Sequence, residues 1–387
     1  MTVSLNSNLV DFGQPTSENG RSAKTPVDCI EASGKAITIG LINNMPDAAL
    51  EPTERQFLSL LDSASSGISV RLLLYSLPGV VRNQSGARHI REFYSSVENL
   101  WGMQLDGLIV TGREPLALNL ADEPYWESFT RVVDWARDNT CSTVWSCLAA
   151  HAAVLYMDGI GRVKNGHKHC GVFDCARVSD HPLTAATPSG IKLPHSRWNG
   201  VPEEELTACG YRVLTRAENV GVDTFIRQQK SLFVFFQGHP EYESDTLCLE
   251  YRRDVGRYLR GETDTYPLIP QGYFDSETVT ALTALQPQGG ARGSDAVLTG
   301  VSRILEEANI ENTWRATAAC IYRNWLLYIC AQKVLRSQGG KVAADGHRVD
   351  GPIPALAGRV PATSVFASNG TRQRTTSTAS LSSPTTL

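Results

Sequence analysis

Three side chains suited to nucleophilic catalysis occur in order along the chain: Cys147, His239 and Glu241. Cysteine attacks as its thiolate, a nearby imidazole can take the thiol proton, and a carboxylate can hold that imidazole in one tautomer and stabilise its charged form. Residue types alone leave an alternative open, because most buried cysteines are inert and a lone histidine at a strand end is usually structural. The hypothesis is a catalytic triad, weighed against a structural cysteine.

The elements around these residues would place them at a cleft. An apolar run at 142–145 predicts a strand and the small residues after Cys147 predict a helix, so the cysteine is expected in the tight turn between the two. There its sulfur can face a cleft, and the helix N-terminus favours the thiolate. His239 follows another apolar run, 231–236, so both side chains are expected at strand ends.

Strand-like and helical patterns alternate through the first half of the chain. Strands are expected at 36–43, 68–75, 106–111 and 142–145. Shorter apolar runs between 171 and 236 resemble the later part of an extended sheet more than a second domain. Further helices are expected at 244–260, 297–308 and 314–334. The pattern predicts an α/β fold with a mostly parallel sheet, helices on both faces and ligands at the carboxyl ends of the strands.

Composition divides the chain into three parts. Residues 1–35 contain many Ser, Asn, Gly and Thr and are expected to form a flexible N-terminal segment. Residues 36–335 are expected to form the domain, in which the Pro-, Gly- and Thr-rich stretch 261–295 would be a long excursion over the surface. Residues 336–387 are expected to be a disordered tail rich in Ser, Thr and Gly.

Charge and cysteine usage exclude several classes of protein. The 36 basic and 40 acidic residues give a net charge of −4 and are spread along the chain, without the clustering that nucleic-acid binding needs. No segment reaches the roughly 20 apolar residues that a membrane span requires. Nine scattered cysteines and a polar N-terminus without a signal-peptide pattern favour a cytoplasmic protein.

Several segments are similar, in the same order, to the homoserine O-acyltransferases, which share the class I glutamine amidotransferase-like fold. The segments are NNMPDAALEPTERQFLSLL (43–61), DGLIVTG (106–112), LPHSRW (193–198), GHPEYESDTLCLEYRRDV (238–255) and WRATAACIYRNWLLY (314–328). The resemblance covers roughly 36–332. It implies transfer of an acyl group from acyl-CoA to L-homoserine through an acyl-cysteine, in methionine biosynthesis. It also implies a homodimer and no cofactor beyond acyl-CoA as co-substrate.

The resemblance assigns roles to further residues. Arg197, Ser196 and Arg253 are expected to bind the acceptor, and the small Ala117 favours succinyl-CoA over acetyl-CoA. Backbone N–H groups at Leu148, Asn43 and Met45 would stabilise the oxyanion. From the residues alone, Arg197 would be a surface residue paired with a neighbouring acid, and Arg253 would be a solvated charge on a helix.

The chain departs from the family pattern in two places. The residues from Cys147 read Cys-Leu-Ala-Ala-His-Ala, where the family usually has Cys-Trp-Gly-Ala-Gln-Ala. The loop after Met45 carries Asp47 where lysine is common, so a basic group expected near the acyl donor is missing. L-serine is an alternative acceptor because it is one methylene shorter. A glutamine amidotransferase-like hydrolase and a non-catalytic ligand-binding relative are further alternatives.

A metal site is the last hypothesis raised by residue type. His and Cys side chains gather at His167, His169, Cys170, Cys175 and His181, and both types bind zinc. Their spacing fits no common zinc pattern, so we expect no metal.

Overall fold

A computed structural model of the chain describes residues 3–5, 36–188, 190–287 and 295–342. The flexibility predicted for most of 1–35 and the disorder predicted for 343–387 concern residues outside these ranges and stay predictions. None of the described helices is long and apolar enough to cross a membrane.

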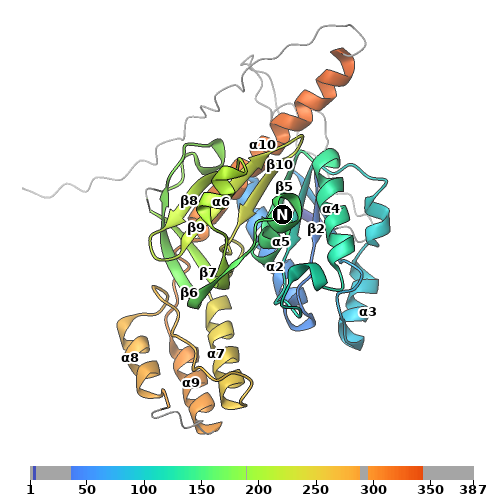
Figure 1. Cartoon of the computed structure of the whole chain (residues 1–387). Coiled ribbons are helices and arrows are strands. Elements are labelled where there is room, and N and C mark those ends of the chain that lie inside the picture. The colour runs from blue at the N-terminus through green and yellow to red at the C-terminus, as the bar shows by residue number, and fades with distance from the viewer. Residues whose placement is uncertain (1–2, 6–35, 189, 288–294, 343–387) are drawn as a thin grey trace, which may run out of the picture. The chain divides into compact units, whose positions relative to one another are not determined.

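One sheet organises the described residues (Figure 1). In spatial order, its parallel strands are β1 (Val3–Leu5), β3 (Val70–Tyr75), β2 (Ile37–Ile42), β4 (Gly107–Thr111), β5 (Ser142–Ser146) and β10 (Leu232–Phe236). Antiparallel strands extend the sheet beyond β10: β9 (Gly221–Gln228), β8 (Arg212–Ala217), β6 (Val163–Arg177) and β7 (Ile191–Gly200). The predicted α/β fold with a mostly parallel sheet is confirmed, as is the continuation of the sheet after residue 171.

Helices cover both faces of the sheet and bury separate apolar cores. On one face, α2 (Asp47–Ser65) and α10 (Arg315–Val342) pack over strands β2 to β5. On the other, α4 (Trp126–Asn139), α5 (Leu148–Asp158) and α6 (Glu203–Ala208) bury their apolar side chains. The central strands lie between the two cores, which explains why they are apolar throughout. Helix α3 (Gln84–Phe93) follows β3.

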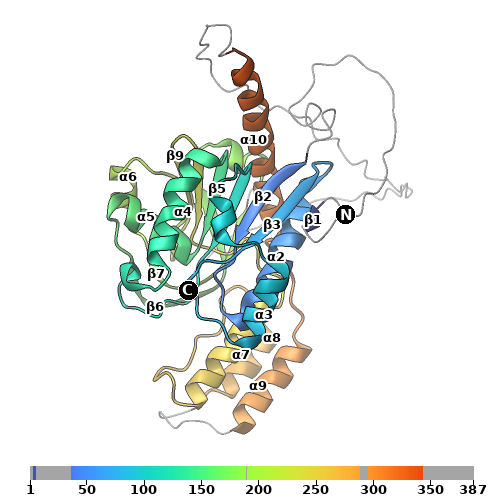
Figure 2. The same ribbon diagram turned by 90° about the vertical axis from the view of Figure 1, so that its right-hand side faces the viewer.

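A third core is formed by helices that lie together at one end of the sheet (Figures 1 and 2). They are α7 (Thr246–Leu259), α8 (Ser276–Ala284) and α9 (Asp295–Glu307). The stretch 261–295 was expected to be a long excursion over the surface, and it contains α8. Its signal was local: the Asp275 side chain caps the helix by accepting from the Thr278 N–H at 2.7 Å, and Leu282 is fully buried.

Both predicted domain boundaries differ from the structure by a short element. Strand β1, within the segment expected to be flexible, pairs with β3 and buries Val3. Helix α10 continues past the predicted end at 334 to Val342. Lys333 donates to the Ala36 carbonyl and Asp106, and Arg336 donates to the Thr140 carbonyl. These contacts hold the turn of α10 at 333–336 against the sheet.

Candidate active site

The candidate residues meet where four neighbouring parallel strands end. Asn43 follows β2, Gly112 follows β4, Cys147 follows β5 and His239 comes shortly after β10. These strands are adjacent in the sheet, so their carboxyl ends form one edge, and helix α5 begins there. The position agrees with the rule that open α/β sheets bind ligands at this edge.

Cys147 occupies a strained turn between β5 and α5. Its φ of 51° and ψ of −112° lie in a region that non-glycine residues rarely adopt. Its N–H donates to the Phe236 carbonyl at 2.7 Å, which ties the turn to β10, the strand that leads to His239. The side chain is half-buried, so the predicted nucleophile turn is present with the cysteine partly accessible.

Glycine is required beside this turn. A Cβ placed on Gly112 would lie 2.7 Å from the Leu148 nitrogen and 2.8 Å from the Ala149 nitrogen. The first amides of a helix have no acceptor within the helix. The loop after β4 therefore runs directly against the N–H groups that can stabilise an oxyanion beside Cys147, in agreement with the role expected for Leu148.

His239 and Glu241 form the predicted pair. Nδ1 of His239 lies 2.8 Å from Oε1 of Glu241, and both residues are buried. A carboxylate accepts, so the Nδ1 proton points to Glu241 and Nε2 is left for Cys147. The Tyr242 ring stacks on the imidazole, with centroids 4.2 Å apart. The ring of His239 is thereby held in one orientation.

The proton affinity of His239 follows from these neighbours. Burial opposes its charged form, but the negative charges of Cys147 and Glu241, with hydrogen bonds to both, raise its pKa well above the usual value. An imidazolium held against a thiolate is the arrangement that a cysteine nucleophile needs.

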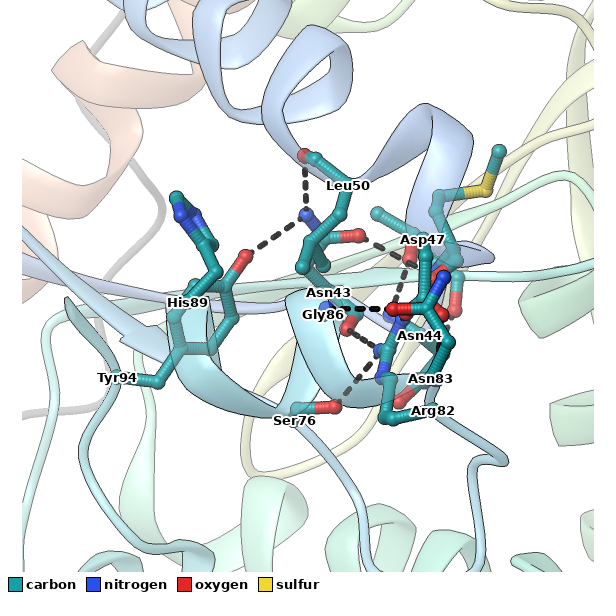
Figure 3. A network of polar contacts seen from close by, with 12 residues as sticks. Asn43, Asn44, Asp47, Leu50, Ser76, Arg82, Asn83, Gly86, His89 and Tyr94 are labelled. Atoms are coloured by element: carbon teal, nitrogen blue, oxygen red, sulfur yellow. Dashed lines mark hydrogen bonds and ion pairs between the residues drawn. The ribbon is translucent and has the colours of Figure 1, made fainter. Parts of the chain in front are cut away.

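The loop after β2 is used differently from the prediction (Figure 3). The Asn43 N–H donates to the Tyr75 carbonyl, and the Met45 N–H donates to Oδ1 of Asn43 at 3.2 Å. The Asn43 side-chain amide also donates to the Leu50 carbonyl and the Tyr94 hydroxyl, each at 3.0 Å. Both backbone N–H groups are occupied by the protein itself, so the structure does not offer them to an oxyanion.

Arg82 supplies a basic group at this loop, although the lysine is missing (Figure 3). Its guanidinium donates to the carbonyls of Asn43 and Met45 and to Oγ of Ser76, and it pairs with Asp47 at 3.4 Å. Asp47 also accepts from the Asn83 N–H at 2.7 Å. The contacts fasten the loop to the segment after β3. No spacing rule in the sequence connects residues so far apart, so the prediction missed Arg82.

A polar network extends from Tyr242 away from the triad. The Tyr242 hydroxyl donates to Oε1 of Glu250 at 2.7 Å, and the Ser196 hydroxyl donates to Oε2. Ser196 is on β7 and Glu250 on α7. The predicted acceptor residue Ser196 is thus connected to His239 through Glu250 and the ring of Tyr242.

Charged residues complete this network. Arg253 donates to Oδ1 of Asp254 at 2.9 Å, and Lys168 of β6 donates to Oδ2 at 2.7 Å. Burial opposes the charge of Lys168, but Glu250 and Asp254 raise its pKa. Arg253 keeps 47% of its side chain exposed, in contact with these partners. Lys168 is the functional candidate that the sequence reasoning passed over, because it lies outside the apolar run recognised from Gly171 onwards.

Arg197 is buried, which overturns its interpretation as a surface ion pair. Its terminal nitrogens donate to the carbonyls of Asn199 and Val220, both at 2.6 Å, and its side chain is almost fully covered. Burial lowers its pKa, while the negative charges of Cys147 and Asp223 oppose that shift. The described partners of the guanidinium are protein groups, and binding of a substrate carboxylate by Arg197 stays a prediction.

Ala117 lies in a loop that is fixed by a buried acid. The N–H groups of Leu116 and Ala117 donate to Oε1 of Glu123 at 2.6 and 2.8 Å, and Glu123 is 3% exposed. The region expected to select the acyl group therefore has a defined backbone. Among the described residues, no group of three or more His, Cys, Asp or Glu side chains is arranged to hold a metal ion.

Comparisons with known proteins identify similar sequences and one structure of low similarity. Residues 17–336 match the profile of a family described as homoserine O-succinyltransferase. The homoserine O-succinyltransferase of Methylorubrum extorquens is 46% identical over 76% of this chain and 88% of its own length. That of Rhodopseudomonas palustris is 45% identical over 78% and 90%. A solved glutamine amidotransferase from Methylobacillus flagellatus is 14% identical, with a TM-score of 0.39, and the match covers 76% of this chain and 95% of that chain.

Proposed function

The chain belongs to the homoserine O-succinyltransferase family, and we propose that Cys147, His239 and Glu241 carry out its reaction. The protein transfers a succinyl group to the hydroxyl of L-homoserine, a step of methionine biosynthesis. The observation that supports this site is the contact between His239 and Glu241 beside the strained turn of Cys147. Succinyl-CoA is the proposed donor.

The first half-reaction acylates the cysteine. The Cys147 thiolate attacks the thioester carbonyl, and the N–H groups at the start of α5 stabilise the oxyanion. The bond between the carbonyl carbon and the coenzyme A sulfur then breaks. The imidazolium of His239 gives its proton to the departing sulfur, so coenzyme A leaves as a thiol and His239 becomes neutral.

The second half-reaction uses that neutral imidazole. The thiolate charge that helps to raise the pKa of His239 is absent while Cys147 is acylated, so the ring is a free base. His239 takes the hydroxyl proton of homoserine, the oxygen attacks the acyl carbon, and the carbon–sulfur bond of the acyl-enzyme breaks. The O-succinyl ester leaves and the thiolate–imidazolium pair is restored. This order of events gives ping-pong kinetics.

Substrate selection rests on residues near the triad. The small Ala117 leaves room for the succinyl chain, and Ser196, Arg197 and Arg253 are proposed to contact the amino acid. Arg253 suits this role because its guanidinium is still half-exposed beside the buried network. Rejection of serine requires a difference of about 1 to 3 kcal/mol for one methylene, which a fitted pocket provides.

We further propose a cytoplasmic homodimer that needs no cofactor besides its two substrates. Light scattering of the purified chain tests the dimer: a mass of one chain at working concentration would contradict it. Full activity after exhaustive dialysis against a chelator is expected, and a loss restored by a metal ion would contradict the cofactor proposal.

The central experiment assays release of free coenzyme A by the full chain. Succinyl-CoA and acetyl-CoA are each tested with homoserine and with serine, and succinyl-CoA with homoserine is expected to be fastest. Cys147→Ala should abolish turnover and the mass increase of one succinyl group on the enzyme. Cys209→Ala, at another half-buried cysteine, is the matched control and should retain both. Full activity of Cys147→Ala would exclude the mechanism.

A further inference from the structure

A second histidine–carboxylate pair lies behind the catalytic one. His195 of β7 and Asp223 of β9 are both 0% exposed, and Nε2 of His195 is 3.3 Å from Oδ1 of Asp223. Neither residue belongs to the triad or to the predicted substrate contacts. Two fully buried titratable groups are costly to retain unless other groups compensate for their lost hydration, so their neighbours show what they do.

The neighbours of His195 define its tautomer and charge. Its Nδ1 accepts from Nε of Arg197 at 3.3 Å, so the ring proton is on Nε2, the nitrogen that lies 3.3 Å from the Asp223 carboxylate without the alignment of a hydrogen bond. Burial and the positive charge of Arg197 lower the pKa of His195, which leaves the ring neutral. A neutral imidazole therefore connects the Arg197 guanidinium with the Asp223 carboxylate.

Asp223 is ionised, and both oxygens of its carboxylate accept hydrogen bonds. Burial would raise its pKa, but hydrogen bonding from His195 and from two threonine hydroxyls lowers it. Oδ2 accepts from Thr215 at 2.8 Å and from Thr224 at 2.6 Å. Oδ1 accepts from the Gly238 N–H at 3.2 Å. The carboxylate thus joins β8 and β9 to the residue directly before the catalytic histidine.

The backbone at His239 is clamped between this carboxylate and β7. A Cβ on Gly238 would lie 2.8 Å from Oδ1 of Asp223 and 2.9 Å from the Pro194 carbonyl, so no larger residue fits. The next amide, that of His239, donates to the same Pro194 carbonyl at 2.8 Å. The position of the catalytic imidazole is therefore set by contacts to two antiparallel strands that carry none of the triad.

We propose that Asp223, together with His195, is a positioning residue for acyl transfer: it fixes the backbone of Gly238 and His239 and the guanidinium of Arg197 relative to Cys147. The inference rests on the proposed function, in which Cys147 and His239 react. It adds that catalysis depends on a buried carboxylate that never touches substrate.

The test compares Asp223→Ala with Asp223→Asn in the full chain. Asparagine keeps an oxygen for the Gly238 N–H and for His195, whereas alanine removes both contacts. Asp223→Ala should lower kcat by about 100-fold, the effect of moving a catalytic group by about 1 Å, and change the KM for succinyl-CoA by less than about threefold. Asp223→Asn should stay within about tenfold of the native kcat, since the geometry is preserved.

Alkylation of Cys147 by iodoacetamide gives a readout that does not depend on substrates. In Asp223→Ala, the imidazolium is no longer held against the sulfur, so alkylation should need a higher pH than in the native protein. Asp223→Asn should keep the native profile. A folded Asp223→Ala with native kcat and native alkylation profile would overturn the proposal, as would equal losses in the Ala and Asn variants.

A matched control and a second position separate positioning from stability. Asp106 accepts from the Thr38 N–H at 2.8 Å and from Lys333 at 2.6 Å at the opposite edge of the sheet, so Asp106→Ala should lower stability and leave kcat unchanged.

If Asp223→Ala does not fold, His195→Gln and His195→Leu replace it. Glutamine keeps a donor for Asp223 and should retain more kcat than leucine; equal values would overturn the proposal. Absence of acyl transfer in the native chain would instead contradict the proposed function, and the alkylation profiles would still report on Asp223.

Discussion

At the scale of single residues, the charge on Cys147 controls the proton affinity of His239. The thiolate is among the causes that raise the pKa of His239, so Cys147→Ala should lower that pKa. NMR titration of the histidine ring measures the change. Cys209→Ala should leave the His239 titration as it is in the native protein, and an equal shift in both variants would disprove the coupling.

His151 makes the folded state sensitive to acid. It stands where the family usually has glutamine, its Nε2 donates to Oε1 of Gln237 at 2.9 Å, and it is buried. Burial, with the charge of Arg197, lowers its pKa to about 3. The unfolded chain binds a proton at this side chain near pH 6.5, whereas the folded chain binds it only near pH 3. The free energy of unfolding is therefore highest above pH 6.5 and decreases as the pH falls towards 3.

His151→Gln should remove this loss, because glutamine can keep the contact to Gln237 and does not titrate. Between pH 7 and pH 5 the native protein should lose about 2 kcal/mol more unfolding free energy than the variant. Urea denaturation at both pH values measures the difference. Parallel losses in the two proteins would show that His151 is not the source.

The contact between His239 and Glu241 beside the turn of Cys147 could be predicted because residue type, order and strand-end position all pointed to the same three residues. Arg82, Lys168 and Asp223 could not be found in the same way. Their roles come from partners on other strands and helices, and a charged residue in a single sequence looks like a solvated one until its burial is known. The same limit explains why Arg197 could not be recognised as buried.

At the scale of elements, the loop after β4 packs against the first turn of α5, where the oxyanion site is proposed. Gly112→Ala places a Cβ within 2.8 Å of the Leu148 and Ala149 nitrogens, so the first turn of α5 must move. We expect kcat to fall by about 100-fold or more, the usual effect of losing an oxyanion donor. In Gly102→Ala the new Cβ meets nothing within 4 Å, so steady-state kinetics should be unchanged. A fully active Gly112→Ala would place the oxyanion site elsewhere.

The parallel strands were predictable because burial on both faces makes them short and uniformly apolar. Strand β6 is different: most of its residues are exposed or half-buried, so the sequence showed only the segment near Gly171. Helix α8 was hidden by the prolines and glycines around it, and β1 by the polar residues that follow it. Each missed element gains its stability from tertiary contacts that local patterns do not encode.

At the scale of the whole molecule, α10 packs along the central strands and closes one apolar core. Trp325 is buried on this helix and its indole N–H donates to Oγ of Ser142 at 2.9 Å. Trp325→Ala should cost about 3 to 5 kcal/mol of unfolding free energy, because it leaves a large cavity and removes the indole donor to Ser142. Chemical denaturation measures this.

Leu335→Ala is the control for that experiment, since Leu335 lies on the same helix and is 55% exposed. It should change stability by less than about 0.5 kcal/mol. Both variants should keep the native kcat per folded molecule. A loss below 1 kcal/mol in Trp325→Ala would show that the cavity collapses.

The mixed sheet also has a consequence for how new activities could arise on this scaffold. The nucleophile turn belongs to the parallel strands, whereas Lys168, Ser196 and Arg197 come from the antiparallel extension and Arg253 from α7. Among the described strands, only β10 pairs with strands of both halves. If Ser196 and Arg197 bind the acceptor as proposed, exchange of the antiparallel half between relatives, with its contacts to Gly238 retained, should change the nucleophilic acceptor and leave the acyl-cysteine step proposed for Cys147 in place.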